Sequence, residues 1–278
     1  MSILLFTLYL LIGSTVAGLV GALTGLGGGV LLVPMLILLF HVNVHYAVGA
    51  SLISVIATSS GASAAYLREG YTNLRIATFL LVATVAGALF GALLAEHLHG
   101  RIIAIIFGVV LIFSAYLSLR RQEALEDEQP SSSLAIRLDM EGCVPDVSGC
   151  KPYHVYNLMG GFSLMLVAGT LSGLLGIGSG AVKVLAMDQV MRLPYKVSTT
   201  TSNFMIGVTA AASAGVYFTQ GFIDPGLTMP VMLGVFLGAV VGAKFLMVAK
   251  TELLRIFFSL IVFLLALEMI YGGLTGKI

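Results

Sequence analysis

The chain is poor in charged residues, and this absence indicates its class. Only 10% of its 278 residues are charged, whereas 58% are hydrophobic and the mean hydropathy is +1.04. A soluble domain carries about 25% charged residues, so the composition excludes an ordinary soluble protein. The apolar runs are continuous over about 20 residues and lack the alternation of a membrane β-barrel. The composition therefore predicts an all-α integral membrane protein.

Other absences narrow the function. The net charge of +1 provides no strong basic surface, so we expect no nucleic-acid partner. Residues 1–12 contain no basic residue, so we interpret them as the start of a spanning helix and not as a cleaved signal peptide. No nucleophile-elbow, Walker, zinc-protease or haem motif is present, which disfavours an enzyme and an ATP-driven pump. The two cysteines, Cys143 and Cys150, lie in a polar linker, where we expect the thiols of a cytoplasmic loop. We expect no cofactor and no metal.

The chain repeats itself after 151 residues without a gap. Most of the matching positions hold glycine or a small polar residue, which mark special backbone positions. The matches include Gly18 with Gly169, the glycines 25, 27 and 29 with 176, 178 and 180, Ser51 with Ser202, Gly87 with Gly238, and Gly91 with Gly242. A duplicated, glycine-interrupted apolar chain is typical of secondary transporters built from two repeats.

Five apolar segments in each half predict two repeats of opposite orientation. The segments cover residues 3–25, 29–40, 46–67, 74–95 and 101–119, and then 155–175, 180–191, 197–219, 226–248 and 253–271. Because the number per half is odd, the second half enters the membrane from the opposite side. We therefore expect a membrane repeat over 1–119, a polar linker over 120–154 that connects the halves, and a second membrane repeat over 155–278.

The basic residues predict the orientation. Ten arginines and lysines fall on one side of this arrangement, and only Arg101 and Lys277 fall on the other. The positive-inside rule makes the first side cytoplasmic, with both termini outside and the linker inside. Asn73 and Asp224 occupy matching positions before their helices, where we expect both to act as N-caps. We interpret the outer-side histidines as interfacial loop residues: His41, His45, His97 and His99.

The second apolar segment of each half is too short to span a membrane. Residues 29–40 and 180–191 are about 12 long, whereas a spanning helix needs about 20. Each follows a glycine cluster, at 25–29 and 176–180, and glycine tolerates non-helical backbone. We predict two broken helices whose N-termini converge near the bilayer midplane and bind an anion. We interpret the other paired glycines as helix-packing positions: Gly87, Gly91, Gly238 and Gly242.

The predicted anion site combines backbone and side-chain donors. Lys183 lies just inside the second short segment, where a lysine is costly and indicates function. The alternative for Lys183 is an ion pair with Asp188 or Glu268, and the hydroxyl donors have interhelical hydrogen bonding as their alternative. The predicted binding residues are Gly27, Gly28, Gly29, Ser51, Gly178, Ser179, Gly180, Lys183, Ser202 and Asn203. Asp188 and Glu268 are the candidates for proton coupling, and a uniporter driven by the membrane potential is the alternative.

These motifs resemble the TauE/SafE family of prokaryotic membrane transporters, the sulfite-exporter type. The resemblance is carried by GLGGGVLLVP, ending at Pro34, by GIGSGAVK, ending at Lys183, and by YKVSTTTSN, ending at Asn203. It covers nearly the whole chain apart from the linker. It implies alternating-access transport of a small sulfur anion such as sulfite, sulfoacetate or thiosulfate across the cytoplasmic membrane. The exact anion, the direction of transport and the oligomeric state, including a homo-oligomer, stay open. The alternative functions are an anion channel and a membrane-embedded enzyme of sulfur metabolism.

Overall fold

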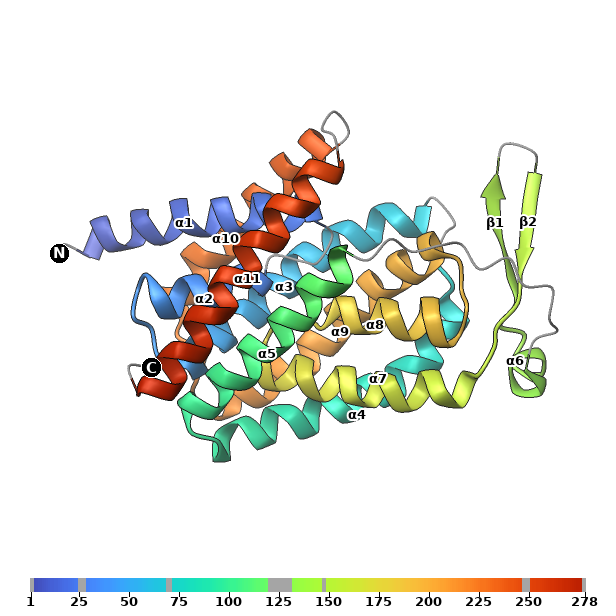
Figure 1. Ribbon diagram of the computed structural model, residues 1–278, viewed down its shortest axis with the longest axis horizontal. Helices are drawn as coiled ribbons and strands as arrows, with labels where there is room; N and C mark the ends of the chain where they lie inside the picture. The colour runs from blue at the N-terminus through green and yellow to red at the C-terminus, as the bar shows by residue number, and fades with distance from the viewer. Residues whose placement is uncertain are drawn as a thin grey trace.

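A computed structural model describes residues 3–24, 29–68, 72–119, 132–146, 149–246 and 251–276 as a bundle of helices (Figure 1). The first half contains α1 (Ile3–Thr24), α2 (Gly29–Leu38), α3 (Val44–Arg68), α4 (Leu74–His97) and α5 (Gly100–Leu119). The linker contains α6 (Ser133–Arg137), β1 (Gly142–Asp146) and β2 (Gly149–Tyr153). The second half contains α7 (Leu158–Leu175), α8 (Gly180–Leu185), the π-helix η1 (Ala186–Val190), α9 (Tyr195–Thr219), α10 (Pro225–Leu246) and α11 (Thr251–Thr275).

Helices occupy all ten predicted apolar segments, which confirms the all-α prediction. Three of the described helical stretches are long and apolar enough to cross a membrane: Val44–Gly61, Leu74–His97 and Leu158–Leu175. Five further described helices are apolar over 10 to 17 residues. The second segment of each half is short, as predicted. Helix α2 has 10 residues, and α8 has 6 before it continues as the 5-residue η1.

Glycines bring α4 and α7 into backbone contact. A Cβ atom placed on Gly87 would lie 2.2 Å from the carbonyl oxygen of Leu166, and one on Gly169 would lie 2.2 Å from that of Thr84. Real Cβ atoms essentially never come within 3.0 Å of another heavy atom, so only glycine fits at this crossing. Small residues permit such close approach between membrane helices. This confirms the packing role predicted for Gly87.

The contact between α1 and α10 reproduces this arrangement in the other pair of helices. A Cβ atom on Gly18 would lie 2.3 Å from the carbonyl oxygen of Val235, and one on Gly238 would lie 2.0 Å from that of Thr15. The two contacts are equivalent under the 151-residue repeat: Gly18 corresponds to Gly169, and Val235 corresponds to Thr84. The first helix of each half therefore packs on the fourth helix of the other half. The environment of the predicted packing residue Gly242 lies outside the described side chains.

The bundle has two distinct ends. At the end where α1 begins and α11 terminates, His45 Nε2 lies 3.0 Å from the carbonyl oxygen of Ala95, and Gln220 donates to Glu96 over 2.9 Å. The β1–β2 hairpin lies at the opposite end, which we call the linker end (Figure 1). There Asn73 accepts hydrogen bonds from the backbone N–H groups of residues 75 and 76, so it is the predicted N-cap of α4. Asp224 accepts from the N–H of Gly226 and confirms the matching cap of α10.

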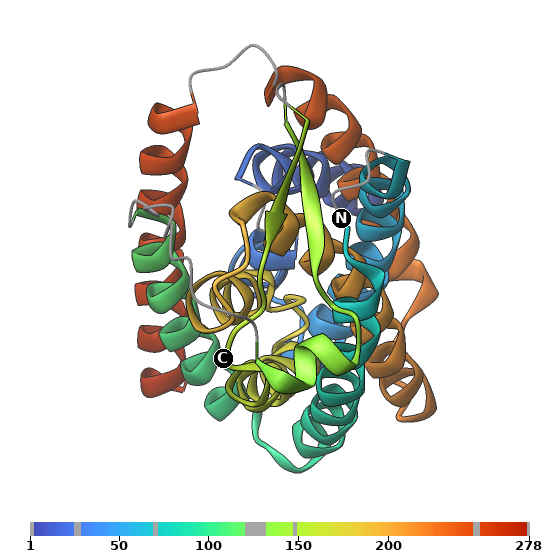
Figure 2. The ribbon, with the colours of Figure 1, turned by 90° about the vertical axis from the view of Figure 1, so that its right-hand side faces the viewer.

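The linker is a folded element and not only a connection. Its antiparallel hairpin pairs Gly142 with Tyr153 and stands in front of the bundle when the linker end faces the viewer (Figure 2). The Asn73 amide donates to the phenol oxygen of Tyr153 over 2.7 Å and to the carbonyl oxygen of Met140 over 2.9 Å. Burial raises the pKa of Tyr153, so the phenol keeps its proton at neutral pH. Met140 and Tyr153 are buried in one hydrophobic cluster with residues of α4, η1 and α9.

The cysteines depart from the prediction. Cys143 is disulfide-bonded, and Cys150 is the other cysteine of the chain, so the expectation of free thiols is wrong for this structure. The ladder places Cys143 opposite Pro152, and Cys150 opposite Pro145. Proximity in the hairpin, which the linker sequence did not predict, brings the two residues together.

Candidate functional site

The second glycine cluster interrupts the helix where the sequence predicts it. Helix α7 ends at Leu175, and Gly176 and Gly178 take left-handed backbone angles, with φ of 69° and 71°. Ser179 is also left-handed, with φ of 48° and ψ of 35°. An L-residue in that region is strained, which is common where a binding site needs an unusual backbone. Helix α8 then starts at Gly180. The predicted broken helix is confirmed in the second half.

The first glycine cluster lies largely outside the described residues. Helix α1 ends at Thr24 and α2 begins at Gly29, so the predicted site residues Gly27 and Gly28 are not placed. Gly29 is placed, and it has no room for a side chain. A Cβ atom there would lie 2.8 Å from Ser51 Oγ and 3.1 Å from the carbonyl oxygen of Gly176. The start of α2 therefore lies directly against the second break.

Ser51 joins α3 to the second break through a hydrogen bond. Its Oγ, on α3, donates to the carbonyl oxygen of Gly176 over 2.8 Å, across 125 residues of sequence. This is the interhelical role that the sequence left as the alternative for the hydroxyl donors. The donor of Ser51 is used by the protein in this conformation, while its oxygen can still accept.

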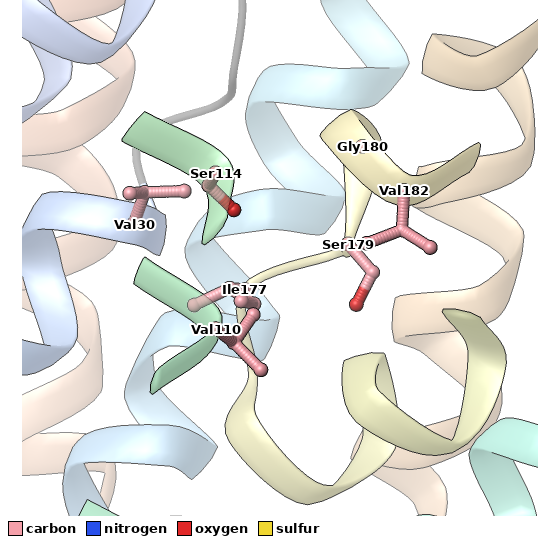
Figure 3. A pocket seen from close by; sticks show the side chains of 7 residues that line it. All are labelled: Val30, Val110, Ser114, Ile177, Ser179, Gly180 and Val182. Atoms are coloured by element: carbon pink, nitrogen blue, oxygen red, sulfur yellow. The ribbon is translucent and has the colours of Figure 1, made fainter. Parts of the chain in front are cut away.

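A small cavity separates α2, α5 and the second break (Figure 3). It is lined by Val30, Val110, Ser114, Ile177, Ser179, Gly180 and Val182. About 10 Å³ is open to the centre of a water-sized sphere, which is room for about one water molecule. Ser179 is only 4% exposed, and its Oγ has no hydrogen-bond partner among the residues that the structure describes. A buried hydroxyl without a partner is costly, but five of the seven lining residues are valine, isoleucine or glycine, so the cavity itself is mainly apolar.

Lys183 is the charged group of the site. Its side chain is 0% exposed, and its Nζ donates to Thr209 Oγ1 over 3.1 Å. Thr209 in turn donates to the carbonyl oxygen of Met205 over 2.6 Å. Among the described residues, no carboxylate oxygen lies within 4.0 Å of Lys183. The equivalent residue of the first half is Leu32, so the charge belongs to one half only.

The remaining predicted donors lie along α9. Ser202 Oγ is 3.5 Å from the carbonyl oxygen of Gly180, a long contact at the start of α8. Asn203 contributes its backbone carbonyl oxygen to a hydrogen bond from Ser59 Oγ. At the linker end, the N–H of Asn73 donates to Thr201 Oγ1 over 3.2 Å. The structure thus places Ser202 beside the second break and uses the backbone of Asn203 to join α9 to α3.

The two acids considered for proton coupling are not paired with Lys183. Asp188 is half-buried within η1, and Glu268 is exposed on α11. Neither forms an ion pair with Lys183 within the described ranges, so the predicted alternative for the lysine is wrong. The part of the chain that the structure describes also contains no group of three histidine, cysteine or acidic residues able to hold a metal.

Two residues of the site escaped the sequence reasoning. Thr209, the partner of Lys183, lies seven residues after Ser202, which is two helical turns along the same face of α9. That spacing could have identified it. Ser114 lines the cavity from α5, and no pattern around it distinguishes it from other small residues of an apolar helix.

A buried helix interruption in the second half and several apolar helices define the class as a multi-pass membrane protein. The family described as "Sulfite exporter TauE/SafE" matches residues 10–269, and the chain belongs to this family. The chain is 26% identical over 267 residues to "Probable membrane transporter protein YunE" of Bacillus subtilis (strain 168), covering 93% of this chain and 95% of that protein.

Two further relatives extend the comparison. "Probable membrane transporter protein YdhB" of the same organism is 28% identical over 229 residues, which cover 82% of this chain and 85% of the relative. "Probable membrane transporter protein MJ0441" of Methanocaldococcus jannaschii is 23% identical over 283 residues, which cover 96% of each chain. No solved structure matches the chain significantly. The family and the names of these relatives agree on membrane transport.

Proposed function

We propose that this chain is a secondary transporter of small sulfur-containing oxyanions, with sulfite as the first candidate, that works by alternating access in a prokaryotic cytoplasmic membrane. The family description names sulfite export, and the relatives are named as membrane transporters, which supports transport over catalysis. The skew of basic residues supports a cytoplasmic linker end and outward termini.

The observation that carries the proposal is the buried amino group of Lys183 beside a helix interruption. A buried charge normally pairs with an opposite charge, and the described residues supply none within 4.0 Å. An oxyanion would supply the missing negative charge. The Ser179 hydroxyl, which no described residue bonds, lies on the same interruption and would add a neutral donor. Neutral donors with a single cation suit a transporter, because the anion must also be released.

The proposed site lies between the two interruptions. Backbone N–H groups of Gly27 to Gly29 and of Gly178 to Gly180 would contact the anion, with Ser202 and Asn203 as side-chain donors. Ser51 would join them only after releasing the carbonyl oxygen of Gly176. Movement of the second break away from α2, α3 and α5 would therefore both enlarge the cavity and free a donor. The cavity holds about one water molecule, so an oxyanion needs that movement.

The experiment measures uptake of labelled sulfite by purified protein in liposomes, with binding measured in detergent. We expect saturable flux at transporter rates. Lys183→Met should weaken sulfite binding by the worth of a charged hydrogen bond, about 1.5–3 kcal/mol, or about 10- to 150-fold in Kd. The matched control is Lys196→Met, because Lys196 is exposed at the start of α9 and lies away from the break.

Three outcomes would contradict the proposal. Flux at channel rates would favour the anion channel. Conversion of sulfite into another species would favour the membrane-embedded enzyme. If Lys183→Met and Lys196→Met bound sulfite equally well, both at normal expression, the site would lie elsewhere.

A further inference from the structure

No described carboxylate lies close enough to Lys183 to balance a positive charge on its side chain. Four elements pack on α8: α9, η1, α7 and α5. Their titratable side chains are Tyr195, Lys196 and Tyr217 on α9, Asp188 on η1, Arg101 and Tyr116 on α5, and none on α7. Asp188 is thus the single carboxylate on these four helices, and it lies beyond 4.0 Å from the lysine. The glycine cluster at 25–28 has no ionisable side chain to add.

The protonated and neutral forms of this lysine make different demands. A buried ammonium needs both an opposite charge and partners for its three N–H donors, whereas a neutral amine needs only ordinary hydrogen bonds. Thr209 Oγ1 provides one partner, at 3.1 Å, and it serves either form. The negative charge that would favour the protonated form is therefore absent from the described surroundings of the lysine. A bound anion would provide it.

We propose that Lys183 is the proton-coupling group: it gains a proton when an oxyanion binds beside it and loses that proton when the anion leaves. The reaction is balanced, because the amine and one proton become an ammonium, and the ammonium with a monoanion is neutral overall. On the far side of the membrane the same proton and anion are released together. The chain then co-transports one proton with each monoanion. This inference rests on the proposed transport function.

Two consequences separate this mechanism from the alternatives. Co-transport of a proton with a monoanion moves no net charge, so the pH gradient and not the membrane potential drives it. A bare anion uniporter would respond in the opposite way. Coupling through Lys183 also leaves no role for the acids considered from the sequence. That fits the exposure of Glu268 and the lack of an ion pair between Asp188 and the lysine.

The test measures proton uptake during sulfite binding, by calorimetry in buffers of different ionisation enthalpy. At alkaline pH sulfite is a dianion, and the wild-type protein should take up about one proton per sulfite bound. Lys183→Arg keeps a permanent positive charge, so it should bind sulfite with almost no proton uptake. Equal uptake by wild type and Lys183→Arg would overturn the inference, because the substrate or another group would then carry the proton.

Two further measurements keep the inference falsifiable if the arginine variant does not bind. Asp188→Asn and Glu268→Gln should retain the wild-type proton uptake, and its loss in either variant would assign the coupling to that acid. In liposomes at mildly acidic pH, where sulfite is mainly the hydrogensulfite monoanion, one proton with each anion carries no net charge, so flux should follow an imposed pH gradient and ignore a potassium diffusion potential. Sulfite flux that follows the potential would overturn coupling but leave the transport function intact. No sulfite binding or flux in the wild type would instead contradict the transport function itself.

Discussion

The glycine crossing between α4 and α7 yields a quantitative prediction. In Gly87→Ala the new methyl group would lie 2.2 Å from the carbonyl oxygen of Leu166 and 2.9 Å from the N–H nitrogen of Thr170. Both are backbone atoms, so neither can turn away as a side chain would. Ordinary contact begins at 3.4 Å, so the helices must separate by about 1 Å. Overpacking of this kind costs about 1–3 kcal/mol.

The same change elsewhere in the chain supplies two matched comparisons. Gly238→Ala should cost about as much, because its Cβ atom would lie 2.0 Å from the carbonyl oxygen of Thr15 in the equivalent α1–α10 crossing. Gly215→Ala, within α9, would meet nothing within 4 Å. It should be neutral or stabilising by about 0.4–1 kcal/mol, because alanine restricts the unfolded chain.

The assay is the unfolding midpoint of each purified variant in one detergent, by thermal or denaturant titration. We expect Gly87→Ala and Gly238→Ala to fall below the wild type and Gly215→Ala to match or exceed it. The double variant should lose the sum of the two effects, because the two crossings share no contact partner. If Gly87→Ala were as stable as Gly215→Ala, the close approach of α4 and α7 would be wrong.

Three further predictions concern the site and the linker. Asn73→Ala should lower the free energy of unfolding by about 1–3 kcal/mol, because it removes the α4 cap and the bonds to the linker; an unchanged denaturation midpoint would mean that the hairpin does not dock. Ser51→Ala should cost about 1–3 kcal/mol in the same titration, because it leaves the Gly176 carbonyl oxygen without this donor. As a control, Ser60→Ala at an exposed position should change the free energy of unfolding by no more than about 0.5 kcal/mol. If the two variants lost equal stability, the hydrogen bond from Ser51 to Gly176 would not be stabilising. Cys143 is disulfide-bonded, so it should resist an alkylating agent until a reductant is added; alkylation without reductant in rapidly quenched cells would show that this end faces the reducing cytoplasm.

The sequence alone identified the helical segments and the position of the second break. A continuous apolar run predicts a membrane helix without knowledge of its neighbours, because the backbone hydrogen bonds of such a helix are formed within the helix. Gly176 and Gly178 take the left-handed angles that glycine tolerates, so a local property predicted their conformation. The offset of 151 residues likewise identified which glycines would recur at equivalent helix crossings.

Only the tertiary structure decided which groups meet. Ser51 reaches the carbonyl oxygen of Gly176 across 125 residues, and Lys183 finds Thr209 on another helix, because helix packing brings them together. The folded linker was missed since its short helix and hairpin lack a long periodic pattern, and docking through Asn73 stabilises them. Composition and spacing predict the local structure of one segment. The partners of a buried charge such as Lys183 come from other segments, so only the folded structure identifies them.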